Sequence, residues 1–236
     1  MTGARRLAMA VLVALAAGGT AAPAAEAVAK VQQMVVFRHG PAVTKRVSAA
    51  ETSVRVGARR CAVGDGTPLA ALARSLPGRL RLSDFGACSS RPRDAAGLFV
   101  TGIRDERNRG ERGWVYKVGH RAASAGAGDM GGPFGHGRLR TGQRVSWFYC
   151  LRATDCQRTL GLRVVPMAGG IVATVRGYDD AGDGVAVEGA RVSAAGVTGL
   201  TAADGRVQLM LPSGAHGVVA RKEGVVRSFK ERVEVP

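Results

Sequence analysis

The sequence predicts an α+β domain followed by an all-β domain. Short segments of alternating apolar and polar residues recur along the chain, whereas only one segment combines a helical apolar repeat with start and stop residues. The charge also changes along the chain. Residues 28–167 hold 24 basic and nine acidic residues, and residues 168–236 hold eight of each. We therefore expect domains at residues 28–160 and 171–236, joined by a linker at residues 161–170.

The N-terminal residues predict a secretory signal peptide over residues 1–27. Arg5 and Arg6 precede an apolar run from Leu7 to Ala17, and the triplet at residues 25–27 is typical of a cleavage site. The run is shorter than the roughly 20 residues that cross a bilayer. We expect a secreted, extracellular or cell-surface protein that keeps no transmembrane segment once the signal is removed.

Four cysteines predict disulfide bonds rather than a metal site. Export places Cys61, Cys88, Cys150 and Cys156 in an oxidising compartment. Three pairings are open to four cysteines. The short spacing favours Cys150–Cys156, which leaves Cys61–Cys88. Zinc is the weaker alternative because the chain has no Cys-x-x-Cys pair, and we expect no cofactor.

The first domain begins with strands and one helix. Residues 34–38 form a short apolar run, and residues 52–57 alternate as a half-buried strand does. Thr67 is a side-chain N-cap, Pro68 suits the first helical position, and the leucines that follow recur on one face. The sequence Pro77-Gly78 then ends the helix.

Three further strands are predicted at residues 97–103, 114–118 and 144–150, with a charged hairpin connecting the first two. Alternation places Trp114 and Tyr116 on one face of their strand. It places Trp147 and Tyr149 on one face of theirs. Two interpretations stay open: these rings form the core of the sheet, or they form a ligand platform with the small-residue loop. The candidate ligand-binding residues are Trp114, Tyr116, Trp147 and Asp129.

The first domain resembles the transcobalamin-like domain of unknown function found in exported bacterial proteins. The resemblance covers roughly residues 31–151. It rests on the helix TPLAALARSL, on GLFVTGI, on GWVYKVG from Gly113, on GAGD from Gly126 and on LRTGQRVSWFY from Leu139. It implies a β-grasp-like fold, in which a mixed sheet wraps around one helix. It also implies a small-ligand carrier of corrinoid type as an alternative function.

The C-terminal region resembles the carboxypeptidase-regulatory-like module over nearly all of residues 171–235. In RVQLML, residues 206–211, apolar and polar residues alternate, and Pro212-Ser213-Gly214 turns the chain back. Gly189-Ala190-Arg191-Val192 and Asp204-Gly205-Arg206 also match the module. The resemblance implies a small transthyretin-like or immunoglobulin-like β-sandwich.

An enzyme is not expected. The run VVFRHGP, residues 35–41, resembles the opening of a histidine phosphatase active site, and His216 resembles its second histidine. That family needs another arginine soon after Arg-His-Gly and a largely helical body, and both are missing here, so a secreted phosphatase is a remote alternative. His120 and His136 flank the small-residue loop. Residues 179–184 are acidic, but we expect a solvated turn there rather than a calcium site.

The positive charge of the first domain favours an acidic partner. Residues 28–167 carry a net charge of +15, and we expect this domain to contact an acidic cell-envelope polymer or a surface protein, without specific nucleic-acid recognition. Two alternatives stay open. The arginines reflect a GC-rich genome and contribute only solubility, or the chain carries a small ligand.

Overall fold

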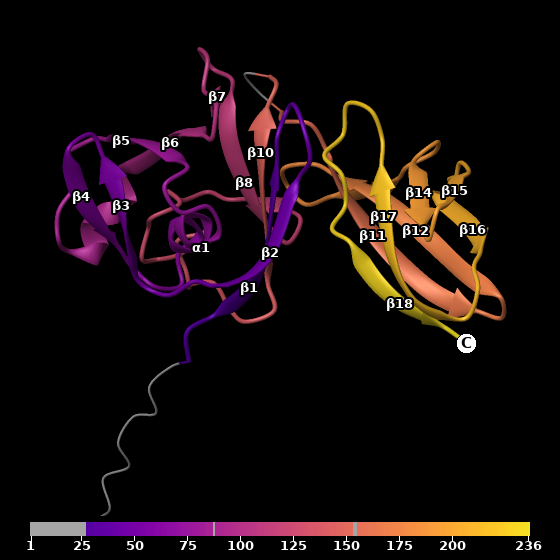
Figure 1. Ribbon diagram of the computed structural model, residues 1–236. Helices are drawn as coiled ribbons and strands as arrows, with labels where there is room; N and C mark the ends of the chain where they lie inside the picture. Colours follow the sequence, from indigo (N-terminus) through magenta and orange to yellow (C-terminus); the bar gives the residue numbers. More distant parts are fainter. Residues whose placement is uncertain (1–26, 87, 153–154) are drawn as a thin grey trace, which may run out of the picture.

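The computed structural model describes residues 27–86, 88–152 and 155–236, which build two hydrophobic cores (Figure 1). The first core draws on residues 29–149 and the second on residues 160–235. Residues 1–26 of the predicted signal peptide lie outside the described residues. Within the described part of the chain, no helix is long and apolar enough to cross a membrane.

A five-stranded mixed sheet forms the centre of the first domain. Its order is β2 (Val43–Ser48), β1 (Lys30–Val36), β10 (Arg144–Cys150), β8 (Gly113–Val118) and β9 (Arg121–Ala122). β1 and β10 run parallel, and the other neighbours are antiparallel. The predicted mixture of strand directions is therefore confirmed.

One α-helix, α1 (Pro68–Ser75), packs on one face of this sheet. Thr67 caps it as predicted, because its side-chain oxygen accepts a hydrogen bond from the amide of Ala70 at 3.2 Å. The amide of the Gln33 side chain on β1 donates to the Ser75 hydroxyl, so a buried polar contact joins the sheet to the end of the helix.

Two smaller sheets complete the first domain. β3 (Thr52–Val56) pairs with β4 (Arg59–Val63), and a second sheet has the order β5 (Leu80–Asp84), β6 (Leu98–Ile103), β7 (Glu106–Arg107). A 3₁₀ helix, η1 (Pro92–Gly97), leads into β6.

The predicted hairpin between β6 and β8 is wrong, because these strands belong to different sheets. The side chain of Asn108 lies between them. Its amide nitrogen donates to the Val100 carbonyl at 3.0 Å, and its oxygen accepts from the Trp114 amide at 3.0 Å. Asn108 thus replaces the direct strand pairing that the sequence suggested.

Two four-stranded sheets surround the second core. One contains β12 (Gly170–Tyr178), with β11 (Thr159–Met167) along one side and β13 (Gly184–Ala186) and β16 (Arg206–Met210) along the other. The other has the order β15 (Val197–Leu200), β14 (Arg191–Ala194), β17 (Gly214–Arg221), β18 (Glu231–Val235). This two-sheet arrangement is the all-β domain that the sequence predicted.

The predicted linker at residues 161–170 is wrong. These residues form most of β11 and its turn into β12, and Leu160 and Leu162 lie in the second core. Pro166 and Gly169 suggested a linker. However, β11 is an edge strand, where a proline is tolerated, and Gly169 takes the positive φ of 70° in the hairpin turn.

Candidate functional site

The structure brings three of the predicted ligand-binding residues together, but as part of the core. Trp114, Tyr116 and Trp147 are 4%, 9% and 1% exposed. Tyr116 and Trp147 stack with ring centroids 4.9 Å apart, and Trp114 meets Tyr149 edge-on at 6.0 Å. Of the two interpretations that the sequence left open, the sheet core accounts for these contacts.

The polar atoms of these rings are mostly satisfied inside the protein. The Tyr116 hydroxyl donates to the Ala125 carbonyl at 2.8 Å, and Trp114 Nε1 donates to the Glu106 carbonyl at 3.0 Å. Burial, with a smaller contribution from the Asp129 carboxylate, raises the pKa of Tyr116, so its phenol stays protonated. Asp129 itself accepts from the Gly131 amide at 2.7 Å within its loop. Among the described residues, buried Trp147 Nε1 has no hydrogen-bond partner.

An apolar hollow of about 360 Å³ lies beside the three rings. We use the name apolar hollow for the space lined by parts of β6 and β8, by the alanine- and glycine-rich loop at residues 122–127, and by Trp147. Phe85 and Phe99 also line it. They are 78% and 48% exposed and meet edge-on with centroids 6.4 Å apart.

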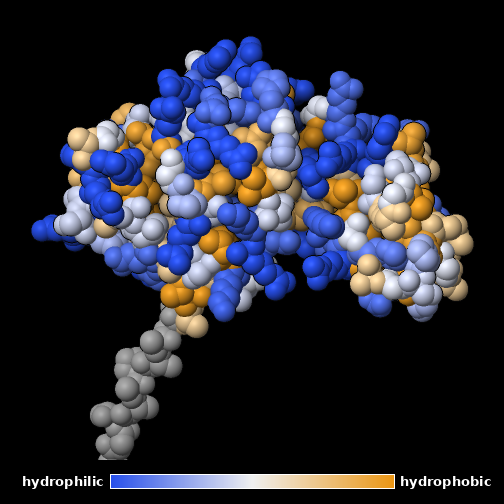
Figure 2. Space-filling model, viewed as in Figure 1, coloured by the Kyte–Doolittle hydropathy of each residue, from blue (hydrophilic) through white to orange (hydrophobic). Residues whose placement is uncertain are grey.

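Arginines line a second hollow, of about 660 Å³, near the end of β10. We call it the tip hollow. Its lining includes Arg38, Arg109, Arg112 and Arg152, with Glu111 as its one carboxylate. The guanidinium of Arg38 lies over the Tyr149 ring at 5.2 Å, and Figure 2 shows hydrophilic residues gathered at the top of the view, above β7, β8 and β10.

A third concavity, of about 690 Å³, lies between β2 and β3 and reaches the end of α1. We call it the β2–β3 groove. Four arginines and no carboxylate are among its lining residues, and the arginines are Arg46, Arg55, Arg60 and Arg74. The tip hollow and the β2–β3 groove together therefore hold eight arginines and one acid.

Few of the basic side chains are neutralised within the protein. Within the described ranges, six of the 24 basic residues at positions 28–167 form an ion pair with a carboxylate: Arg59, Arg93, Lys117, Arg138, Arg144 and Arg158. None of the eight arginines of the two concavities is among them. Internal ion pairing therefore does not explain why arginines gather there.

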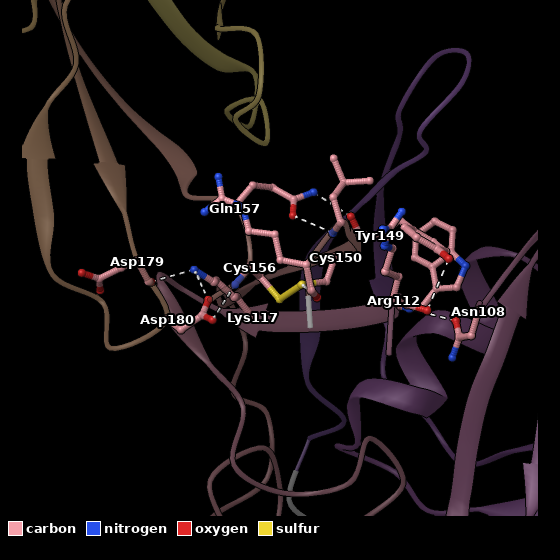
Figure 3. The surroundings of a disulfide bond; sticks show 12 residues. Asn108, Arg112, Lys117, Tyr149, Cys150, Cys156, Gln157, Asp179 and Asp180 are labelled. Carbon is pink, nitrogen blue, oxygen red and sulfur yellow. Dashed lines mark hydrogen bonds and ion pairs between the residues drawn. A yellow bond between two sulfur atoms is a disulfide. The ribbon is translucent and has the colours of Figure 1, made fainter. Parts of the chain in front are cut away.

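Both predicted disulfides are confirmed. Cys61 joins Cys88, and Cys150 joins Cys156. The second bond lies where the chain passes from β10 to β11 (Figure 3). In the same region the ammonium of Lys117, only 1% exposed, lies 2.9 Å from the Asp180 carboxylate and donates to the Asp179 carbonyl at 2.6 Å. The sequence did not predict this structural role for Lys117.

Two further contacts hold the domains together. Arg144 on β10 forms a two-pronged ion pair with Glu231 on β18. The rings of His120 and Tyr178 stack with centroids 3.6 Å apart. Burial, followed by the charges of Arg144 and Lys117, lowers the pKa of His120, so the stacked imidazole is neutral at pH 7.

The remaining candidate residues have local structural partners. The amide of His39 donates to the Glu106 carboxylate at 3.0 Å in the first domain, whereas the His216 ring bonds to the Pro212 carbonyl at 2.7 Å in the second. His136 bonds to the Phe134 carbonyl. The Asp179 carboxylate accepts from two amides of its own turn, and no metal-binding cluster of acids, histidines or cysteines occurs among the described residues. The turn is not merely solvated as expected, because Asp180 binds Lys117.

No family model, curated protein or solved structure matches the chain. The two family resemblances therefore stay predictions, and the hollows and charged surfaces of the first domain are the observations that bear on function.

Proposed function

We propose that the protein is a secreted binding protein whose first domain holds an acidic cell-envelope partner. The observation that carries the proposal is the gathering of eight arginines and one carboxylate around the tip hollow and the β2–β3 groove. Guanidinium groups bind carboxylates and phosphates in a two-pronged geometry that suits such partners. In this proposal the first domain has the β-grasp-like fold and the second is a transthyretin-like sandwich that serves as spacer or adhesion module.

The disulfides support an extracellular site of action, because both bonds are formed and such bonds persist in oxidising compartments. The charge distribution supports binding through the first domain, because residues 168–236 carry equal numbers of acids and bases. An acidic polymer is therefore attracted to the first domain and leaves the second free.

The test measures binding of inorganic polyphosphate to the full mature chain at several salt concentrations. We expect affinity to fall at least tenfold between about 50 and 300 mM salt, because bound counterions are released on binding. The double substitution Arg109→Glu and Arg112→Glu at the tip hollow lowers affinity at least tenfold at low salt.

A matched control separates a local site from net charge. Arg191→Glu with Arg232→Glu makes the same charge change on exposed positions of the second domain and is expected to alter affinity less than twofold. Equal losses in the two variants, or polyphosphate binding that ignores salt, contradict the proposal.

The apolar hollow favours a second candidate function, the small-ligand carrier. Its volume of about 360 Å³ and its aromatic lining are typical of small-molecule sites, and Trp147 Nε1 is a buried donor without a partner in the described part of the chain. Binding of a small apolar ligand there is expected to be insensitive to salt, so the same salt series with a small apolar dye in place of polyphosphate distinguishes the two functions.

A further inference from the structure

The β2–β3 groove has a strand edge on each side. β2 is the last strand of the five-stranded sheet. Among the described strands β3 forms a ladder with β4 alone, although β5 lies close to it. Consecutive residues of both strands line the groove, at 46–48 and 52–55, and α1 lies between the two strands (Figure 1). An edge strand presents a row of backbone N–H and C=O groups on its outer side. The groove therefore offers backbone hydrogen bonds in addition to charge.

The interior of the groove is apolar. Val47, Leu80 and Leu82 line it and are only half-buried, while Val54 and Leu76 line it from the core. A phosphate or sugar polymer gains little from such a surface. An extended peptide alternates its side chains, so that one set contacts an apolar floor while the other reaches the charged rim.

The rim carries charge at a cost to the fold. Arg55 and Arg60 are directly opposite each other in the β3–β4 hairpin. Like charges at opposed positions destabilise a strand pair. In the described residues neither guanidinium has a carboxylate partner, and Arg60 makes only a 3.4 Å contact to the Ser53 hydroxyl. An acidic ligand relieves this repulsion.

We propose that the β2–β3 groove binds an extended, acidic segment of a partner protein as an added strand. This inference rests on the proposed affinity for acidic partners. It adds that the ligand of this groove is a polypeptide. The four lining residues of β3 span about 13 Å at roughly 3.3 Å per residue, which is the length of about four residues of the added strand. Backbone bonds supply affinity, and the apolar floor selects a small aliphatic residue at every second position.

The test uses a fluorescein-labelled eight-residue peptide of alternating Glu and Val with the full mature chain. Two further peptides carry N-methyl groups on all Glu or on all Val amides, which removes the donors along one edge without changing the charge. We expect one of the two methylated peptides to bind at least tenfold more weakly than the unmethylated parent peptide. Arg55→Glu with Arg60→Glu lowers binding of the parent peptide at least tenfold and keeps a like-charged pair, so the hairpin is no less stable.

The second-domain substitutions Arg191→Glu and Arg221→Glu are the matched control. These exposed arginines also face each other, between β14 and β17, and their reversal makes the same charge change outside the first domain. We expect them to lower peptide affinity less than threefold. The inference is wrong if both methylated peptides bind as tightly as the parent peptide, or if the control and groove variants lose peptide affinity equally. If the parent peptide does not bind while polyphosphate still binds, only the inference is wrong. If neither ligand binds, the proposed function is wrong as well.

Discussion

Replacing Cys61 and Cys88 together by alanine is expected to destabilise the protein by about 3.5 kcal/mol, the largest single effect that the structure predicts. The bond closes a loop of sequence separation 27 and ties β4 to the segment that leads into η1. Opening it restores the conformational freedom of that loop in the unfolded chain. Cys61 is also 1% exposed within the first core, so its sulfur contributes packing contacts.

The second disulfide provides the comparison. Cys150–Cys156 has a sequence separation of only 6, so the same loop-closure argument predicts about 2 kcal/mol for its removal. Urea unfolding followed by tryptophan fluorescence measures both effects, since both tryptophans lie in the first core. If removal of Cys150–Cys156 lowers the free energy of unfolding more than removal of Cys61–Cys88, then Cys61–Cys88 is not the main covalent support of the first domain.

Local signals in the sequence predict the central elements well. The cap at Thr67 defines the start of α1, and short runs rich in aromatic and β-branched residues identify β8 and β10 almost to the residue. Edge strands are harder to predict, because solvent allows them polar side chains and proline. β2 reads VTKRVS, with three consecutive exposed side chains, and β11 contains Pro166. Neither was expected as a strand.

The candidate sites follow from the fold rather than from any motif. The tip hollow gathers Arg38, Arg109, Arg112 and Arg152 from three separate parts of the chain, so the sequence shows only their sum as net charge. The aromatic cluster was predicted because alternation alone places its members on one face of each strand. Lys117 gave one local signal: it is the one charged residue in the strand GWVYKV, which is otherwise apolar apart from Tyr116.

Replacing Asp180 by alanine is expected to destabilise the protein by about 3 kcal/mol, because the Lys117 ammonium then stays buried without its carboxylate. The Tyr178 and Asp179 carbonyls, at 3.3 and 2.6 Å, still accept from the ammonium but do not neutralise it. The Asp180 side chain is 37% exposed, and this access to solvent keeps the effect at the lower end of the range for buried pairs. Urea unfolding followed by tryptophan fluorescence again reports the change.

The two partners of this ion pair are expected to respond unequally. Lys117→Met leaves an Asp180 side chain that is 37% exposed and whose Oδ2 accepts from the Cys156 amide at 3.3 Å, so the substitution is expected to cost about 1 kcal/mol of stability. Adding Lys117→Met to Asp180→Ala removes the uncompensated charge and is expected to recover most of the lost stability. Because Lys117 belongs to β8 and Asp180 follows β12, such recovery shows that the ion pair couples the two domains. If the stability losses of the two single variants add up in the double variant, the coupling is contradicted, because the effects of independent sites are additive and those of a coupled pair are not.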